Sequence, residues 1–167
     1  YFLAFARIIH YKKYPMIARA FKELGLPLKI VGSGPDERVL KKEAAGASNI
    51  EIFPFTRTDQ DLRDIIRGAR ATIVPQLEDF GLSTVESIAC GTPVIGYNRG
   101  GTAEIVRDKV NGLLFEDQTE EGLVNAVREF ENMRFDPNTV ADTAKSYSVE
   151  SFRNKFMGIV ESAFKVN

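Results

Sequence analysis

Short apolar runs alternate with longer amphipathic stretches along the chain up to about Gly101, after which amphipathic stretches dominate. A short apolar run predicts a buried strand, and apolar positions three and four residues apart predict a helix with one buried face. Strands are expected at 2–9, 28–31, 50–53, 71–74, 93–97 and 113–115, the last after a turn at 111–112. Helices are expected at 14–24, 36–45, 59–68, 83–89, 105–107, 120–131, 137–147 and 149–163. Such alternation is typical of repeated strand–helix–strand units, so we expect an α/β fold with a doubly wound parallel sheet and helices on both faces.

Length and charge narrow the class of protein. With 167 residues, 44% of them hydrophobic, the chain is long enough for one well-cored domain and short for two. The balance of 22 Lys and Arg against 23 Asp and Glu gives a net charge of -1, so nothing indicates binding to nucleic acid. A single Cys90 cannot form an internal disulfide, and no apolar run approaches the roughly 20 residues of a membrane span. We therefore expect a cytoplasmic protein, and because the chain opens in an apolar run without Met, we expect residues upstream of Tyr1.

The segment 75–94 carries the most chemistry, because it follows an expected buried strand and leads into a helix. Ligands of open α/β sheets bind beyond the carboxyl ends of the strands. Gly81 permits close backbone approach, and Leu82, Ser83 and Thr84 are expected to present free N–H groups at the helix start. Those groups and the helix dipole favour a phosphate, so a diphosphate is expected there.

Two carboxylates, Glu78 and Glu86, flank this turn with seven residues between them. A carboxylate accepts hydrogen bonds from vicinal hydroxyls, so one could hold a ribose diol and the other a sugar hydroxyl. Taken singly, each Glu is better explained as an ordinary solvent-facing residue, which for Glu86 would be on an amphipathic helix.

With both carboxylates in this segment, the chain resembles glycosyltransferase family 4, the group 1 glycosyl transferases of the GT-B fold. The resemblance places Glu78 beside the donor sugar and Glu86 on the nucleotide ribose. Arg7 and Lys12, five residues apart, match the two family cations that bind the donor diphosphate, although Ala6 and Lys13 stand where the family usually has Gly.

The likeness runs from about Phe2 to Phe115. Gly32 and Gly34 match the family's second strand and glycine turn, where they would shape the rim of the site. Phe55 lies in the region whose backbone reads the base, and neighbouring Pro54 has no N–H to donate.

The resemblance implies that residues 1–167 form the Rossmann-like, donor-binding half of a GT-B enzyme, whose N-terminal acceptor domain is absent from this chain. The whole enzyme would be a retaining glycosyltransferase, with Arg7, Lys12 and Glu78 as its catalytic residues, acting without a metal or a cofactor. The nucleotide diphosphate sugar is then the donor substrate, with GDP-mannose favoured over UDP-linked hexoses. The acceptor would be a glycan or a lipid-linked glycan, as in lipopolysaccharide or polysaccharide synthesis, with the enzyme peripheral at the inner face of the cytoplasmic membrane.

Other functions remain open at the level of sequence. A sugar-nucleotide epimerase or a glycogen-synthase-like enzyme would use the same scaffold with different chemistry. A non-catalytic Rossmann-like interaction module, or a flavodoxin-like domain, would keep the fold alone.

Near the end of the chain, Phe152, Phe156 and Phe164 fall four and eight residues apart, which predicts a stripe of side chains facing the core. In complete GT-B proteins the last helix can instead pack across to the other domain.

Overall fold

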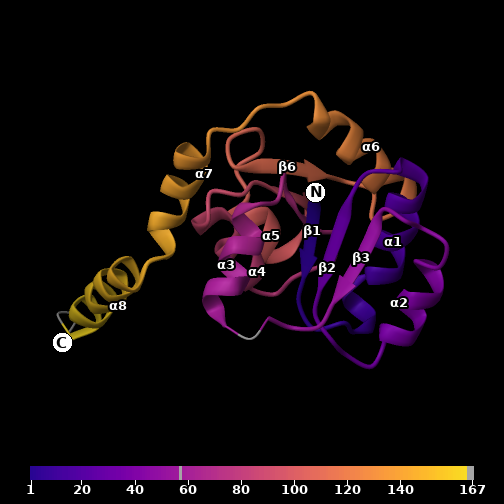
Figure 1. Ribbon diagram of the computed structural model, residues 1–167. Coiled ribbons are helices and arrows are strands. Elements are labelled where there is room, and N and C mark those ends of the chain that lie inside the picture. The colour runs from indigo at the N-terminus through magenta and orange to yellow at the C-terminus, as the bar shows by residue number, and fades with distance from the viewer. Residues whose placement is uncertain (57, 165–167) are drawn as a thin grey trace.

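The computed structural model describes residues 1–56 and 58–164 and contains one six-stranded sheet, in the order β3-β2-β1-β4-β5-β6 (Figure 1). Every pair of neighbouring strands is parallel. The strands are β1 (Phe2–Phe5), β2 (Leu28–Val31), β3 (Ile50–Phe53), β4 (Thr72–Val74), β5 (Val94–Tyr97) and β6 (Gly112–Phe115). The predicted doubly wound α/β fold is confirmed.

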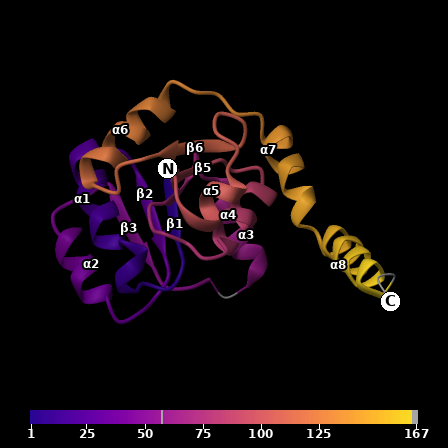
Figure 2. The same ribbon diagram turned by 180° about the vertical axis from the view of Figure 1, so that it is seen from behind.

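Helices cover both faces of the sheet, with α1, α2 and α6 on one face and α3, α4 and α5 on the other (Figures 1 and 2). The helices are η1 (His10–Lys12), α1 (Tyr14–Leu24), α2 (Glu37–Glu43), α3 (Asp59–Arg67), α4 (Leu82–Ala89), α5 (Gly100–Ile105), α6 (Glu120–Glu131), α7 (Pro137–Thr143), η2 (Ala144–Tyr147) and α8 (Val149–Phe164). Because side chains of a strand alternate between faces, Phe2 packs under α1 and α6 while Leu3 packs under α3.

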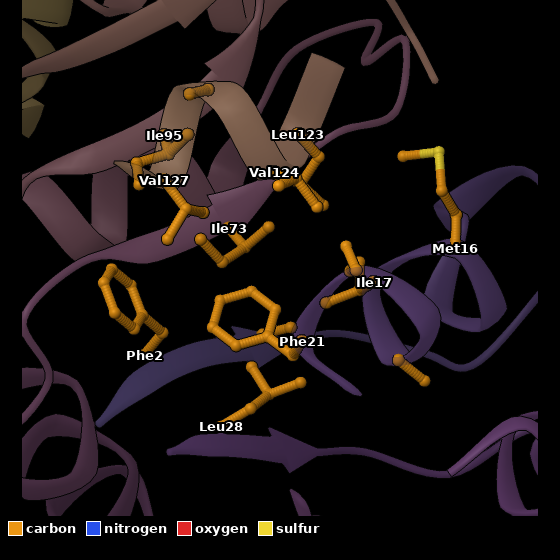
Figure 3. Packing of buried hydrophobic residues seen from close by; sticks show 14 of the residues in the cluster. Phe2, Met16, Ile17, Phe21, Leu28, Ile73, Ile95, Leu123, Val124 and Val127 are labelled. Atoms are coloured by element: carbon orange, nitrogen blue, oxygen red, sulfur yellow. The ribbon is translucent and has the colours of Figure 1, made fainter. Parts of the chain in front are cut away.

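Aromatic rings lie within the larger core, where Figure 3 shows Phe2 and Phe21 among aliphatic side chains. The ring of Phe2 lies 5.3 Å from that of Phe21 on α1 and 6.1 Å from that of Phe130 on α6. Both rings are tilted or edge-on to Phe2, a geometry that aromatic pairs favour. This cluster joins the first strand to helices that are about a hundred residues apart in the chain, and it fixes the sheet against that layer.

Three predicted elements differ from the structure by more than two residues at one end, and one of them is the helix expected at 137–147, where α7 ends at Thr143 and η2 continues to Tyr147. β1 ends at Phe5 rather than at residue 9, because the chain leaves the sheet in a loop whose Ile8 is itself fully buried. An apolar run therefore covered both a strand and a buried loop. The helix expected at 105–107 is α5 at Gly100–Ile105, which begins with two glycines that a propensity rule treats as helix breakers.

The core-facing stripe predicted for the last helix is wrong in this chain. α8 has no buried residue, and Phe152, Phe156 and Phe164 are 65%, 53% and 78% exposed. Figures 1 and 2 both show α8 projecting away from the sheet beyond α7. The apolar spacing is real, but the described part of the chain leaves these side chains largely uncovered.

The loop between β1 and α1 lies against the loop after β2, and two glycines make this approach possible. A Cβ at Gly32 would lie 2.0 Å from the carbonyl oxygen of Ala6, and one at Gly34 would lie 2.2 Å from that of Ile8. The Ile8 N–H donates to the Ser33 carbonyl at 2.9 Å. Gly32 and Gly34 therefore hold the loop that carries Arg7 and Lys12.

We predict that Gly34→Ala lowers the free energy of unfolding by about 1–3 kcal/mol, because the added methyl group overlaps backbone atoms that cannot rotate away. Thermal or chemical denaturation would measure the loss. Gly158→Ala is the matched control, since a Cβ there meets no atom within 4 Å and Ala favours helix. Equal stability of Gly34→Ala and the parent protein would contradict this explanation.

Candidate functional site

The candidate site lies where the winding of the sheet reverses. The chain moves outward from β1 to β2 and β3, then returns to β4 beside β1 and continues to β5 and β6. Loops that leave β1 and β4 at their carboxyl ends therefore diverge and leave a crevice between them, where ligands of such sheets bind. One loop carries Arg7 and Lys12, and the other carries Glu78 and Gly81.

A cleft of about 360 Å³ occupies this crevice. It draws its walls from three loops and the helices that follow them. The lining residues are Phe5, Ala6, Lys12, Phe55, Leu62, Glu78, Phe80, Gly81, Leu82, Ser83 and Glu86. The structure thus brings together most of the residues that the sequence indicated, from segments up to about 80 residues apart.

A second cavity, of about 430 Å³, opens elsewhere, between the ends of α3 and α6. Arg67, Arg70 and Arg134 line it, and Arg70 is paired with Glu131 at 3.0 Å. None of the residues predicted from the sequence lies in its wall. The smaller cleft is the better candidate because it coincides with the switch point and with the predicted side chains.

Lys12 and Glu78 form an ion pair inside the cleft, and their side chains are only 12% and 10% exposed. The Gln76 amide donates a second hydrogen bond to the same Glu78 oxygen, Oε1. Tyr14 is buried nearby, and both burial and the Glu78 charge raise the pKa of its phenol. Since Lys12 reaches Glu78, Lys12 rather than Lys13 enters the cleft.

Lys13 instead shapes the start of α1. Its backbone is left-handed, with φ 59° and ψ 24°. The family that the sequence resembles usually has Gly at this position. A side chain there costs on the order of 1 kcal/mol relative to Gly. The departure from the family pattern therefore changes local backbone energy while leaving Lys12 in place.

The backbone of the Glu78 loop is tied to its surroundings at two points. The Gly101 N–H donates to the Glu78 carbonyl at 2.7 Å, and the Gln118 side chain donates to the Pro75 carbonyl at 2.9 Å. A Cβ at Gly100 would lie 2.3 Å from the Glu78 carbonyl oxygen, so Gly is required for this contact. The loop is consequently held before any ligand binds.

Gly81 caps α4 as the residue immediately before it and has a left-handed backbone, with φ 87°. The N–H groups of Leu82 and Ser83 have no acceptor among the described residues, as expected of a helix start. The same expectation for Thr84 is wrong, because its N–H donates to the Gly81 carbonyl at 3.0 Å and its side chain is fully buried. The first turn of α4 is tightened, which removes one of the three predicted donors.

Glu86 lies one turn into α4 at the open side of the cleft. Partial desolvation raises the pKa of its carboxyl above the usual range, and the negative charge of Asp59 adds to this effect. The two like charges repel each other across the space between α3 and α4. Glu86 thus borders the site as predicted, with an unneutralised charge.

Arg7, Gly32 and Gly34 do not line the cleft. Arg7 is exposed on the loop after β1, and among the described residues it takes part in no ion pair. The two glycines affect the cleft indirectly, because they support the loop that carries Lys12. Residues 1–56 and 58–164 contain no group of three His, Cys, Asp or Glu side chains that could hold a metal ion.

Sequence reasoning missed Gln76, Tyr14 and Leu62. Gln76 lies two residues before Glu78, and this proximity was a signal available from the sequence. Leu62 reaches the cleft from α3, and only the fold could reveal that. Chemically, the arrangement offers one buried cation, two free amides and two carboxylates around an apolar wall, which suits a phosphate-bearing, hydroxyl-rich ligand.

A family model described as "Glycosyl transferases group 1" matches residues 1–147 of the chain. O-antigen chain mannosyltransferase C of Escherichia coli is 28% identical over 158 residues, which is 91% of this chain and 42% of that protein. A D-inositol 3-phosphate glycosyltransferase of Actinosynnema mirum is 40% identical over 87 residues, 50% of this chain and 21% of that protein. The chain thus spans less than half the length of these relatives.

Solved structures share the fold at low identity. The lipopolysaccharide outer core galactosyltransferase WaaB superposes with a TM-score of 0.81 and 17% identity, covering 96% of this chain and 49% of that one. Anabaena Alr3699/HepE in complex with UDP superposes with a TM-score of 0.77 and 18% identity, covering 96% of this chain and 48% of that one. These likenesses confirm a Rossmann-like half of the GT-B fold. None of the described helices is long and apolar enough to cross a membrane.

We predict that Glu86→Gln raises the melting temperature at pH 7. Because the pKa of Glu86 is raised on folding, the folded protein binds a proton there more tightly, and stability falls as pH rises from the ordinary Glu value of about 4.3 through the raised value. The gain should vanish by about pH 3, where both states are protonated. Glu161→Gln, at an exposed position on α8, is the control. A gain that persists at acid pH would contradict the electrostatic cause.

Proposed function

The chain belongs to the group 1 glycosyl transferase family, and from this premise we propose that it is the donor-binding domain of a retaining, two-domain glycosyltransferase. The observation that carries the proposal is the meeting of Lys12, Glu78 and Glu86 with two free amides in one cleft at the switch point. The donor is a nucleotide diphosphate sugar.

Different groups of the cleft bind different parts of the donor. The diphosphate lies on the Leu82 and Ser83 amides, where hydrogen bonds and the helix dipole both favour an anion. Lys12 reaches the phosphates from the opposite loop, and Arg7 approaches from outside the cleft. Glu86 at the mouth takes the ribose diol, and buried Glu78 takes the sugar.

Phe55 and Leu62 form an apolar wall beyond Glu86. A nucleobase stacked on this wall would lose apolar surface to the protein. Pro54 offers no N–H, so this loop reads the base through its other backbone groups and through shape.

Without a protein nucleophile, retention follows when the acceptor attacks from the face that the diphosphate leaves. The acceptor oxygen forms a bond to the anomeric carbon as the bond to the phosphate oxygen breaks, and the acceptor proton passes to the leaving phosphate. Negative charge grows on the diphosphate, where Lys12, Arg7 and the two amides stabilise it. Donors held in place in this way are worth several kcal/mol in the transition state.

The E. coli relative, named as a mannosyltransferase of O-antigen chains, supports GDP-mannose and an acceptor of the lipopolysaccharide or polysaccharide class. The UDP complex of Alr3699/HepE supports a UDP-linked hexose as the second candidate.

The acceptor site belongs to a second, N-terminal domain. The chain covers 42% of the E. coli relative, and its α8 presents a continuous apolar face without a partner among the described residues. Covering that face would bury several large side chains, a gain that an exposed helix lacks. Domain closure over the donor cleft would complete the site.

We predict selective binding of one nucleotide by this chain. Calorimetry or NMR with GDP, UDP, ADP, GDP-mannose and UDP-glucose should identify it, with affinity reduced in Glu86→Gln and Arg7→Ala. A ligand at 100 times its dissociation constant adds about 2.7 kcal/mol to stability, so thermal shift gives a parallel measurement. Equal binding by the parent protein and both variants would contradict the assigned site.

We predict that Phe156→Glu leaves the stability of this 167-residue chain unchanged within about 0.5 kcal/mol, because the ring is exposed. In a polypeptide that includes the proposed acceptor domain, the same substitution should lower the melting temperature clearly. Phe21→Ala, at a fully buried position, should cost about 3–5 kcal/mol in both forms. The same effect of Phe156→Glu in both forms would count against the two-domain arrangement.

A further inference from the structure

Gln76 is a buried polar side chain of the site, and the proposed transfer reaction gives it no role. We infer that Gln76 is a positioning residue, which holds the Glu78 carboxylate toward the donor sugar while Lys12 moves to the donor phosphate. The inference rests on the proposed function, because it takes Glu78 as the group beside the sugar.

Gln76 lies in the short loop between β4 and Glu78 and is only 4% exposed. Its Nε2 donates to Glu78 Oε1, the same oxygen that accepts from Lys12 Nζ. Because both donors share one oxygen, Oε2 keeps its capacity for a hydroxyl of the ligand.

The two donors differ in how easily they leave. Lys12 carries a charge on a long flexible stem, and a diphosphate brings more negative charge than one carboxylate, so the ligand competes with Glu78 for Lys12. Once Lys12 turns away, Glu78 would be a buried carboxylate without its cation, a costly state. Gln76 is short, buried and neutral at every pH, so its amide continues to donate to Oε1.

A purely structural role fits the contacts less well. The backbone of the loop is already fixed by Gln118 at Pro75 and by Gly101 at Glu78. The Gln76 amide is directed to the carboxylate instead of to any backbone carbonyl of that loop. Its contribution is therefore to the orientation of one side chain.

The first test needs no ligand. In NMR spectra of this chain, the side-chain amide resonance of Gln76 should move in Glu78→Gln and stay near its original position in Lys12→Met. A Gln76 resonance that does not respond to Glu78→Gln overturns the inference, whether or not the chain binds nucleotides.

The second test measures affinity for the nucleotide sugar and for its nucleoside diphosphate side by side. Gln76→Leu should reduce affinity for the sugar nucleotide about tenfold and leave affinity for the nucleoside diphosphate unchanged. Glu78→Gln should show the same selective loss, and combining both substitutions should add little to it. Gln118→Leu, which removes an amide from the same loop but away from Glu78, is the control and should show no selective loss.

The outcomes separate the two proposals. An equal loss for both ligands in Gln76→Leu, or the same pattern in Gln118→Leu, would show a general structural role and overturn the inference. If the chain binds neither ligand, or if Glu78→Gln has no selective effect, the proposed donor site fails, and the amide resonance alone then decides whether Gln76 positions Glu78.

Discussion

The buried ion pair between Lys12 and Glu78 joins two loops that the winding of the sheet would otherwise leave apart. One loop follows β1 and the other follows β4, and these strands are neighbours only because the chain returns to the middle of the sheet. The pair therefore spans the crevice where a parallel sheet of this kind accepts ligands. The positions of the cleft, the free amides of α4 and the apolar wall are all defined relative to it.

Stability alone does not explain such a pair. Removing two charges from water costs about as much as their attraction returns, and apolar side chains of similar volume often serve as well. The surrounding structure supports the pair at some expense, with Gly32 and Gly34 allowing close backbone approach and Lys13 held in a left-handed conformation. These local costs are typical of a site kept for ligand binding.

The sequence predicts the strand–helix order well because strands of a doubly wound sheet are buried on both faces and read as apolar runs. The prediction fails where one sequence pattern is compatible with two local structures. The apolar run continues past β1 because Ile8 is buried in a loop, although Arg7 beside it is exposed. α5 starts at Gly100 because tertiary contact overrides helix propensity. In the site, Glu78 and Glu86 stand out because they flank a predicted helix start, and Arg7 and Lys12 were identified by resemblance to the family. Leu62 needed the fold, and the bonded Thr84 amide needed the local geometry of the first helical turn.

The donor cleft and the last helix share one property, which is apolar surface without a cover. Phe80 and Leu82 at the rim of the cleft are largely exposed, as are the aromatic side chains of α8. Single exposed apolar side chains are ordinary, but a groove lined by Phe80, Leu82 and Phe152 connects these two regions into one surface. A single partner covering this surface would both bury α8 and close the cleft over Glu78. Binding of that partner and exclusion of water from the site would then be the same event.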